Sequence, residues 1–170
     1  IVTNEDETEV LKVLRRGGAI SGFDITEKFE DEYKNWQGSQ YALAHSSGTA
    51  SIQAAMFGLK IGVGDEIIAP SVTYWASVLP VYSLGGTVVF SEIDETTLCI
   101  EPKDILKKIN QNTKAIIVVH YCGHPADMDA IMDIAKDKKI FVIEDVSHAH
   151  GALYKNKKVG TFGDVACASL

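Results

Sequence analysis

The sequence predicts an α/β fold in which a mostly parallel sheet is sandwiched between helices. Short segments rich in Val and Ile alternate with segments whose apolar residues recur at helical spacing. The strand segments are apolar without interruption, which is typical of parallel strands that are buried on both faces. No repeat, low-complexity tract or linker divides the 170 residues, so we expect a single domain over 1–170 with its own core.

Two helices are expected at the N-terminus. Residues 6–16 have helically spaced apolar side chains and end at a Gly-Gly pair, so 1–22 should form a helix followed by a loop. A second helix is expected over 26–37. An apolar stripe runs along it and is interpreted as packing against the core: Ile25, Phe29, Tyr33 and Trp36.

Strand and helix patterns then alternate to the end of the chain. The predicted strands lie at 40–46, 65–71, 86–94, 114–120, 140–145 and 165–170. The predicted helices lie at 49–59, 74–84, 102–110 and 126–138, the last capped by Asp127. Pro102 suits the first turn of its helix, whereas Pro80 is expected to kink the helix in which it lies.

Composition and charge argue against several classes of protein. A hydrophobic fraction of 46% and a charged fraction of 23% are typical of a soluble globular protein. The net charge is −7 and no Lys/Arg-rich block occurs, which argues against nucleic-acid binding. The residues Lys155, Lys157 and Lys158 are interpreted as the surface of a hairpin. No apolar run approaches the length of a membrane span, and the N-terminal residues do not resemble a signal peptide.

The cysteines indicate neither a zinc site nor a disulfide framework. Cys99, Cys122 and Cys167 are odd in number and widely spaced, and no CxxC motif occurs. Such cysteine usage favours a reducing cytoplasm.

The first candidate binding residues lie in "HSSGTA", at the start of the predicted helix 49–59. Ligands of parallel α/β sheets bind beyond the carboxyl ends of the strands, and a helix N-terminus there suits a phosphate. Gly48 would let a phosphate approach closely and Thr49 would add its hydroxyl. A plain Ser/Thr helix cap is the alternative. Neither GxGxxG nor a Walker A motif is present, so a dinucleotide or nucleoside-triphosphate site is not indicated.

Aromatic and acidic residues follow two further strands. Tyr74 either lies flat on a planar ligand or fills space between helix and sheet, and for Trp75 we favour packing. Glu144 and Asp145 end a buried strand, where a carboxylate faces either solvent or a cationic group of a ligand. His148 follows closely, but further ligands for a metal are not evident, so no metal site is predicted and a surface turn is the alternative.

One cofactor would use these features together. Pyridoxal 5'-phosphate (PLP) needs an acidic partner for its pyridine nitrogen, a stacking face for its ring and a helix terminus for its phosphate.

Two other histidines near strand ends, His120 and His124, are interpreted as satisfied polar groups without a catalytic role.

Several motifs in order also resemble a known family. These are "SSGTASIQAAMFGLKIGVGDEIIAPSVTY", "GTVVFSEID", "TKAIIVVHYCGHPADMDAI" and "VIEDVSHAHGALYKNKKVGTFGDVACASL". They resemble the DegT/DnrJ/EryC1/StrS family, PLP-dependent aminotransferases of fold type I that mostly make amino sugars from nucleotide-linked keto sugars. The resemblance extends from "AISGFDITEKFEDEY" to the end of the chain. It implies the N-terminal part of the large domain of such an enzyme.

The resemblance assigns the phosphate contacts to two segments. Gly48, Thr49 and Ala50 would hold the cofactor phosphate. Ser169 corresponds to a serine that makes a further phosphate contact.

The resemblance also assigns the ring contacts. Tyr74 would stack on the pyridine ring. Asp145 would pair with the ring nitrogen and keep it protonated. His148 occupies a position near the phenolic oxygen of the ring, where many relatives have glutamine.

The family places its Schiff-base lysine a few residues after the serine that Ser169 matches, and the sequence ends at Leu170. The resemblance therefore implies an N-terminal portion of a longer enzyme that is inactive alone. For the whole enzyme it implies a keto-sugar substrate, glutamate or glutamine as amino donor, and a homodimer.

Two alternatives stay open at this point. A sugar 3-dehydratase of the same fold would have histidine in place of the lysine, and a non-catalytic half-domain would bind the cofactor without a covalent bond, if at all. A Rossmann-type oxidoreductase is disfavoured because the glycine fingerprint is absent.

Overall fold

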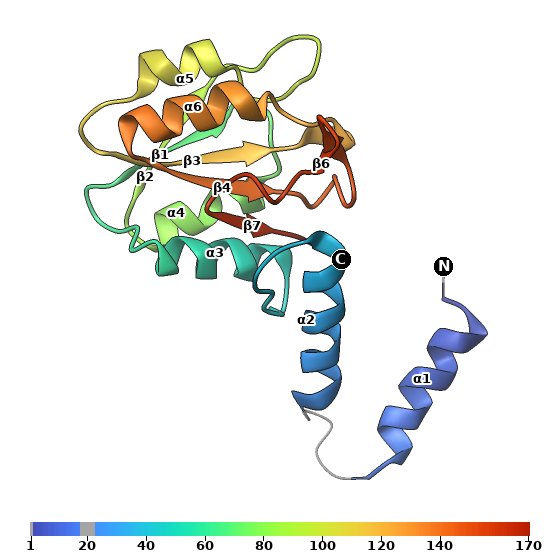
Figure 1. Ribbon diagram of the computed structural model, residues 1–170. Coiled ribbons are helices and arrows are strands. Elements are labelled where there is room, and N and C mark those ends of the chain that lie inside the picture. The colour runs from blue at the N-terminus through green and yellow to red at the C-terminus, as the bar shows by residue number, and fades with distance from the viewer. Residues whose placement is uncertain (1, 18–22) are drawn as a thin grey trace.

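The computed structural model describes residues 2–17 and 23–170, and a five-stranded sheet lies at its centre (Figure 1). The strand order is β2-β1-β3-β4-β7, and all four neighbouring pairs run parallel. The strands are β1 (Glu66–Pro70), β2 (Thr87–Ser91), β3 (Thr113–Val119), β4 (Phe141–Asp145) and β7 (Val165–Cys167). The predicted parallel sheet is confirmed.

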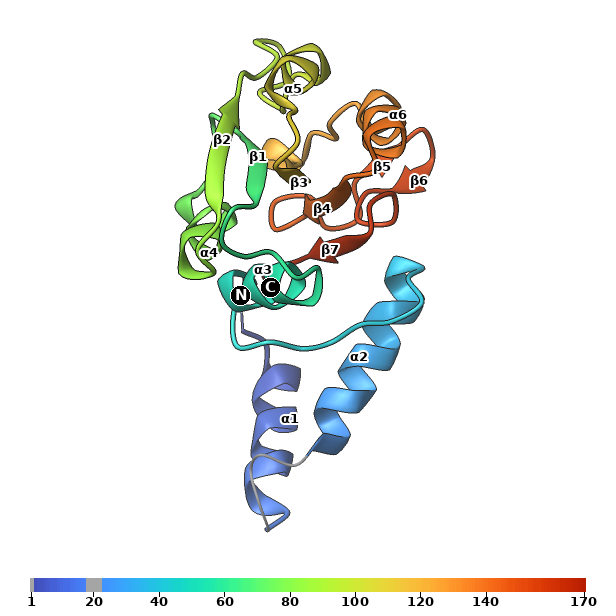
Figure 2. The same ribbon diagram turned by 90° about the vertical axis from the view of Figure 1, so that its left-hand side faces the viewer.

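Helices cover both faces of this sheet (Figure 2). The helices α3 (Gly48–Gly58) and α4 (Leu79–Ser83) pack on one face, and α5 (Pro102–Lys108) and α6 (Met128–Lys138) on the other. Successive strand residues point to opposite faces, so Ile67 packs with the α3 side whereas Ile68 packs with the α6 side. Each face therefore has its own apolar core, as the uninterrupted Val/Ile runs predict.

Two N-terminal helices extend away from these layers (Figures 1 and 2). They are α1 (Asn4–Arg15), which buries no residue, and α2 (Phe23–Gln37). The stripe on α2 was predicted to pack in the core, and this is wrong: Ile25 is 48% exposed, Phe29 41% and Trp36 47%. Periodicity shows that a helix has an apolar face but not what covers that face, and α3 to α6 already cover the sheet. The end of the loop predicted within 1–22 lies outside the described residues.

Two further predictions differ from the structure. Residues 40–46 form no strand and run as irregular chain, since no neighbouring strand pairs with them in the described part of the protein. The helix predicted over 74–84 is divided into a 3-10 helix, η1 (Trp75–Ser77), and α4. Pro80 lies in the first turn of α4, where its missing N–H costs nothing, and so it starts a helix rather than kinking one. Trp75 is 53% exposed, so the prediction that it packs between helix and sheet is also wrong.

Short regular elements also occur between the strands of the sheet. The hairpin predicted at the lysine-rich segment joins β5 (Leu153–Tyr154) and β6 (Lys157–Lys158). Its turn residues Lys155 and Asn156 both have positive φ. A second 3-10 helix, η2 (Tyr121–Gly123), follows β3. Asp127 caps α6 by accepting a hydrogen bond from the Ala130 amide, which confirms that prediction. Among the described helices, none is both long and apolar enough to cross a membrane.

Candidate functional site

The N-terminus of α3 lies beside the residues that follow β7. Ser47 caps this helix by accepting a hydrogen bond from the Ala50 amide (3.1 Å). The amides of Gly48 and Thr49 have no acceptor among the residues that the structure describes. The two interpretations of "HSSGTA" are therefore compatible, because a serine cap and two free amides are present together. A phosphate here would meet free N–H donors and the positive end of the helix dipole.

Gly48 is in contact with Ser169. A Cβ atom at position 48 would lie 2.8 Å from the Ser169 Cβ and 3.2 Å from its Oγ. Only glycine allows this approach, so the helix N-terminus and the Ser169 hydroxyl are brought to one place. His150 Nε2 donates to the Ser169 carbonyl (2.8 Å) and holds the segment after β7. No local sequence pattern indicates this role of His150, because it depends on a contact across 19 residues.

Asp145 is the last residue of β4 and is 6% exposed. Its Oδ2 accepts a hydrogen bond from the Ser77 hydroxyl (2.7 Å), and its Oδ1 accepts one from the Ser147 amide (3.1 Å). Asp145 is thus buried at the carboxyl edge of the sheet, whereas the residues after it form turns in which His148 is exposed, as the surface-turn alternative predicts. Ser77 belongs to η1, 68 residues away in sequence, and no local pattern indicates its contact with Asp145.

Tyr74 and His148 remain accessible on the same edge. Tyr74 immediately precedes η1 and is 61% exposed, and its ring centroid lies 5.0 Å from that of Trp75. His148 is exposed on the loop that follows Asp145, and its ring lies edge-on to Tyr121. Both rings are therefore accessible to a ligand at the carboxyl edge of the sheet, and an aromatic face of this kind can stack on a planar ligand.

Glu144 is fully buried and does not face solvent, which is one of the two surroundings considered for the carboxylates at the end of this strand. Its Oε2 lies 3.1 Å from His120 Nε2, and the amide of Ala126 donates to His120 Nδ1. Because Nδ1 accepts, the imidazole hydrogen is on Nε2 and is donated to Glu144. His120 is thus the satisfied polar group that the sequence predicts.

Glu144 also fixes the turn that leads into β7. Its carboxylate accepts hydrogen bonds from the amides of Gly160 (2.7 Å), Phe162 (2.8 Å) and Gly163 (2.7 Å). Burial alone would raise the pKa of the Glu144 carboxyl. The hydrogen bonds from His120 and from the Gly163 and Gly160 amides outweigh this effect and hold the pKa below its usual value. Glu144 therefore places β7, and through it Ser169, relative to β4.

The substitution Glu144→Gln is expected to destabilise the fold by roughly 3–5 kcal/mol, because an amide NH₂ would then face backbone donors in a buried site. The free energy of unfolding in urea measures this. Glu27→Gln on the exposed face of α2 is the control and should change the free energy of unfolding little.

The stability that Glu144 contributes is also expected to depend on pH. Because its pKa is lower in the folded protein, this contribution is complete above the ordinary pKa of about 4.5 and is lost as the pH falls further. A Gln variant as stable as the parent at pH 7 would contradict this role.

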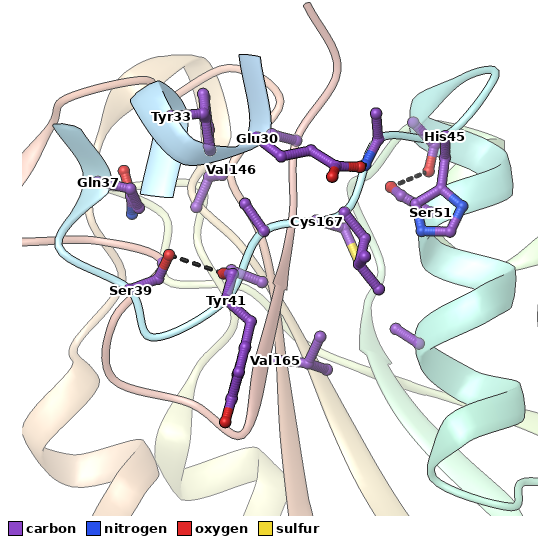
Figure 3. A pocket seen from close by; sticks show the side chains of 18 of the residues that line it. Glu30, Tyr33, Gln37, Ser39, Tyr41, His45, Ser51, Val146, Val165 and Cys167 are labelled. Atoms are coloured by element: carbon purple, nitrogen blue, oxygen red, sulfur yellow. Dashed lines mark hydrogen bonds between the residues drawn. The ribbon is translucent and has the colours of Figure 1, made fainter. Parts of the chain in front are cut away.

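A cavity of about 790 Å³ lies between α2, the irregular segment 38–47 and β7. Figure 3 shows Tyr33 and Gln37 of α2 on one side of it and Ser51 of α3 on the other. It reaches Gly48 and Ser169, but Tyr74, Asp145 and His148 do not line it. The cavity therefore adjoins only the phosphate end of the candidate site.

Cys167, at the end of β7, lines the same cavity. Burial raises the pKa of its thiol to about 12, so it stays protonated at neutral pH and is a poor nucleophile. Within residues 2–17 and 23–170, no group of three His, Cys, Asp or Glu side chains is placed to bind a metal ion.

Two solved structures share this fold. An aminotransferase from Psychrobacter cryohalolentis superposes with a TM-score of 0.94 at 38% identity, covering 99% of this chain and 43% of that one. NtdA from Bacillus subtilis, solved with bound cofactor PMP, superposes with a TM-score of 0.84 at 29% identity, covering 97% and 38%. The chain therefore has the fold of the corresponding part of these two proteins.

The chain belongs to the DegT/DnrJ/EryC1/StrS aminotransferase family, whose sequence model matches residues 1–170. It is 43% identical over 169 residues to the GDP-perosamine synthase of Escherichia coli O157:H7, covering 99% of this chain and 46% of that protein. It is 41% identical over 155 residues to a dTDP-3-amino-3,6-dideoxy-alpha-D-galactopyranose transaminase of Aneurinibacillus thermoaerophilus, covering 91% and 42%. The resemblance seen in the sequence is confirmed, and the chain spans less than half the length of these relatives.

Proposed function

We propose that these residues form the cofactor-binding portion of a PLP-dependent aminotransferase that converts a nucleotide-linked keto sugar to an amino sugar. Membership of the family and the names of the two sugar-nucleotide relatives support this proposal. The observation that carries it is the contact of Gly48 with Ser169 at the N-terminus of α3, at the same sheet edge as the buried Asp145. Glutamate or glutamine is proposed as the amino donor, and the cytoplasm as the location.

The residues present fit the phosphate group of PLP. The free amides of Gly48 and Thr49 and the hydroxyls of Thr49 and Ser169 are donors for its oxygens. The Ala50 amide already donates to Ser47, so Ala50 would contribute through its place in the first helical turn. A phosphate bound here would anchor the cofactor without any covalent bond.

The residues near the end of β4 fit the ring. When bound, PLP supplies an electron sink for reactions at an amine carbon. The Asp145 carboxylate would hold a proton on the ring nitrogen, and its burial keeps water from competing for that contact. Tyr74 would cover one face of the ring, and His148 would contact its edge near the phenolic oxygen.

The lysines of the β5–β6 hairpin are not proposed as Schiff-base partners. Lys155 pairs with Asp129, Lys157 donates to the Thr161 carbonyl, and Lys158 donates to the Trp36 carbonyl. The polypeptide of residues 1–170 by itself is therefore proposed to be inactive in transamination.

Treatment of residues 1–170 with PLP and then borohydride is expected to leave these three lysines no more labelled than exposed Lys139, because their ammonium groups are held away from the site. Peptide mass spectrometry measures the label, with Lys139 as the internal control. A specific adduct on one hairpin lysine, or turnover by this polypeptide, would contradict the proposal.

Incubation of the full-length protein with PLP, glutamate and a nucleotide-linked keto sugar tests the reaction itself. We expect 2-oxoglutarate and an amino sugar in equal amounts. Loss of water from the sugar without 2-oxoglutarate would indicate the 3-dehydratase instead. Cofactor binding without turnover would favour the non-catalytic half-domain.

We also propose that the whole protein is a homodimer. The exposed apolar side chains of α1 and α2, among them Leu14, Phe29 and Trp36, support a surface that a partner covers. Light scattering of the full-length protein should give twice the chain mass, and a monomer at micromolar concentration would contradict this.

A further inference from the structure

Two hydroxyl groups form a chain of hydrogen bonds that ends at Asp145. Thr73 Oγ1 donates to Ser77 Oγ (2.9 Å), and Ser77 Oγ donates to Asp145 Oδ2 (2.7 Å). Each hydroxyl has one hydrogen and an ionised carboxylate only accepts, so the direction of the chain is fixed from Thr73 to Asp145. Ser77 is 1% exposed, so water does not replace this contact.

This use of a serine hydroxyl is unlike that of neighbouring serines. Ser51 donates to the Gly48 carbonyl in its own helix, and Ser83 donates to the Leu79 carbonyl in its own helix. Ser77 instead bonds to a side chain 68 residues away. Buried Ser91 makes a comparable bond to the Asp104 carboxylate, so the bond of Ser77 is informative because its acceptor is Asp145, at the candidate site.

The two oxygens of the carboxylate are held from different loops. Ser77 donates to Oδ2 and the Ser147 amide donates to Oδ1, so rotation of the carboxylate would break one of the two bonds. The plane of the carboxylate is therefore fixed before any ligand binds, and its remaining lone pairs keep one direction.

The same hydroxyls also fix the loop that presents Tyr74. Tyr74 lies between Thr73 and Ser77, and the Ser77 amide donates to the Tyr74 carbonyl (3.0 Å). The turn 73–77 is thus closed on itself and joined to Asp145 by one side-chain bond. The ring that would stack on the cofactor and the carboxylate that would meet its nitrogen are connected through Ser77.

We propose that Ser77, supported by Thr73, is a positioning residue that aims the Asp145 carboxylate at the ring nitrogen of the cofactor and sets the Tyr74 loop against the same ring. This inference rests on the proposed function, because it assumes that Asp145 meets the ring nitrogen. Neither hydroxyl is proposed to touch the cofactor. Both would affect cofactor affinity only through the orientation of the Asp145 carboxylate.

The test compares two probes that differ only at the ring nitrogen. One is pyridoxamine 5'-phosphate, which needs no Schiff-base lysine, and the other is its 1-deaza analogue, in which CH replaces the nitrogen. Quenching of Trp75 fluorescence in the full-length protein would give both dissociation constants. The variants are Ser77→Ala, Thr73→Val, Asp145→Ala and the double variant of Ser77 and Asp145. Ser83→Ala is the matched control, because it removes a helix hydroxyl that does not contact Asp145.

Ser77→Ala is expected to weaken binding of pyridoxamine phosphate about tenfold, with a change of less than about twofold for the deaza probe. Thr73→Val should also weaken binding of pyridoxamine phosphate but not of the deaza probe, by a smaller factor than Ser77→Ala. It tests the inference even if the Ser77→Ala variant folds poorly. In the Asp145→Ala background, the Ser77 substitution should have no further effect. Ser83→Ala should leave both constants unchanged.

Equal weakening of both probes by the Ser77 and Thr73 variants would overturn the inference, because it would show a packing role only. Unchanged affinity in both variants would also overturn it. A parent protein that binds neither probe would instead refute the proposed function. A parent that binds both probes equally, with no effect of Asp145→Ala, would refute the assignment of Asp145.

Discussion

The substitution Asp145→Asn is expected to lower transamination by the full-length protein by on the order of 10²–10³-fold. The amide has nearly the shape of the carboxylate and can still accept a hydrogen bond from Ser77, although its NH₂ group then faces the Ser147 amide donor. It has no negative charge, however, so it no longer favours a proton on the ring nitrogen. At 6% exposure, water contributes little to replace that charge. The ratio kcat/KM for the keto sugar measures the effect.

The control for this substitution is Asp127→Asn. Asp127 likewise accepts a hydrogen bond from a backbone amide, but it is exposed and caps α6, where asparagine serves equally well. This control should keep its activity and its stability. An Asp145→Asn variant with more than about a tenth of the parent activity would contradict the assigned role of Asp145.

The substitution Gly48→Ala is expected to weaken PLP binding by about 10- to 100-fold. The added Cβ would lie 2.8 Å from the Ser169 Cβ, a distance that real Cβ contacts do not reach. The segment after β7 must then move away from α3, which separates the Ser169 hydroxyl from the free amides of Gly48 and Thr49. Equilibrium titration with PLP measures this loss.

Gly58→Ala is the matched control, because Gly58 lies in the same helix and a Cβ there would meet nothing within 4 Å. It should leave PLP affinity unchanged and stabilise the helix slightly. The double variant Gly48→Ala with Ser169→Gly removes the clash and should recover part of the affinity, since the two sites are in contact. Equal affinity in the Gly48→Ala variant and the parent would contradict the close-approach argument.

The parts of the fold that sequence predicts are those set by burial on both faces. The segment 114–120 is predicted as a strand and forms β3, because Ile116 and Ile117 face different cores and both are fully buried. Segment 40–46 is also predicted as a strand, but it contains no Val or Ile and no strand of the described residues pairs with it. Pairing is a tertiary property that local pattern does not contain. The exposed apolar stripe of α2 shows the same limit for a helix, because periodicity predicts an apolar face but not whether another element covers it.

The candidate site likewise contains residues that the sequence predicts and residues that only the structure reveals. Gly48 and Asp145 are predictable from their places after strands and at a helix start, together with the family resemblance. The contact that requires glycine at position 48 depends on Ser169, which is distant in sequence. Ser77 has no local signal either, because a serine in a short turn is ordinary until the structure places it against Asp145. Residues that support a site are thus found from contacts across the sheet edge.

The most direct test of the central claim is a crystal structure of the full-length protein with pyridoxamine 5'-phosphate bound. We expect the phosphate at the amides of Gly48 and Thr49, beside the Ser169 hydroxyl. We expect the ring nitrogen within hydrogen-bond distance of Asp145, with Tyr74 stacked on the ring. A phosphate bound elsewhere, or a ring nitrogen that does not meet Asp145, would contradict it.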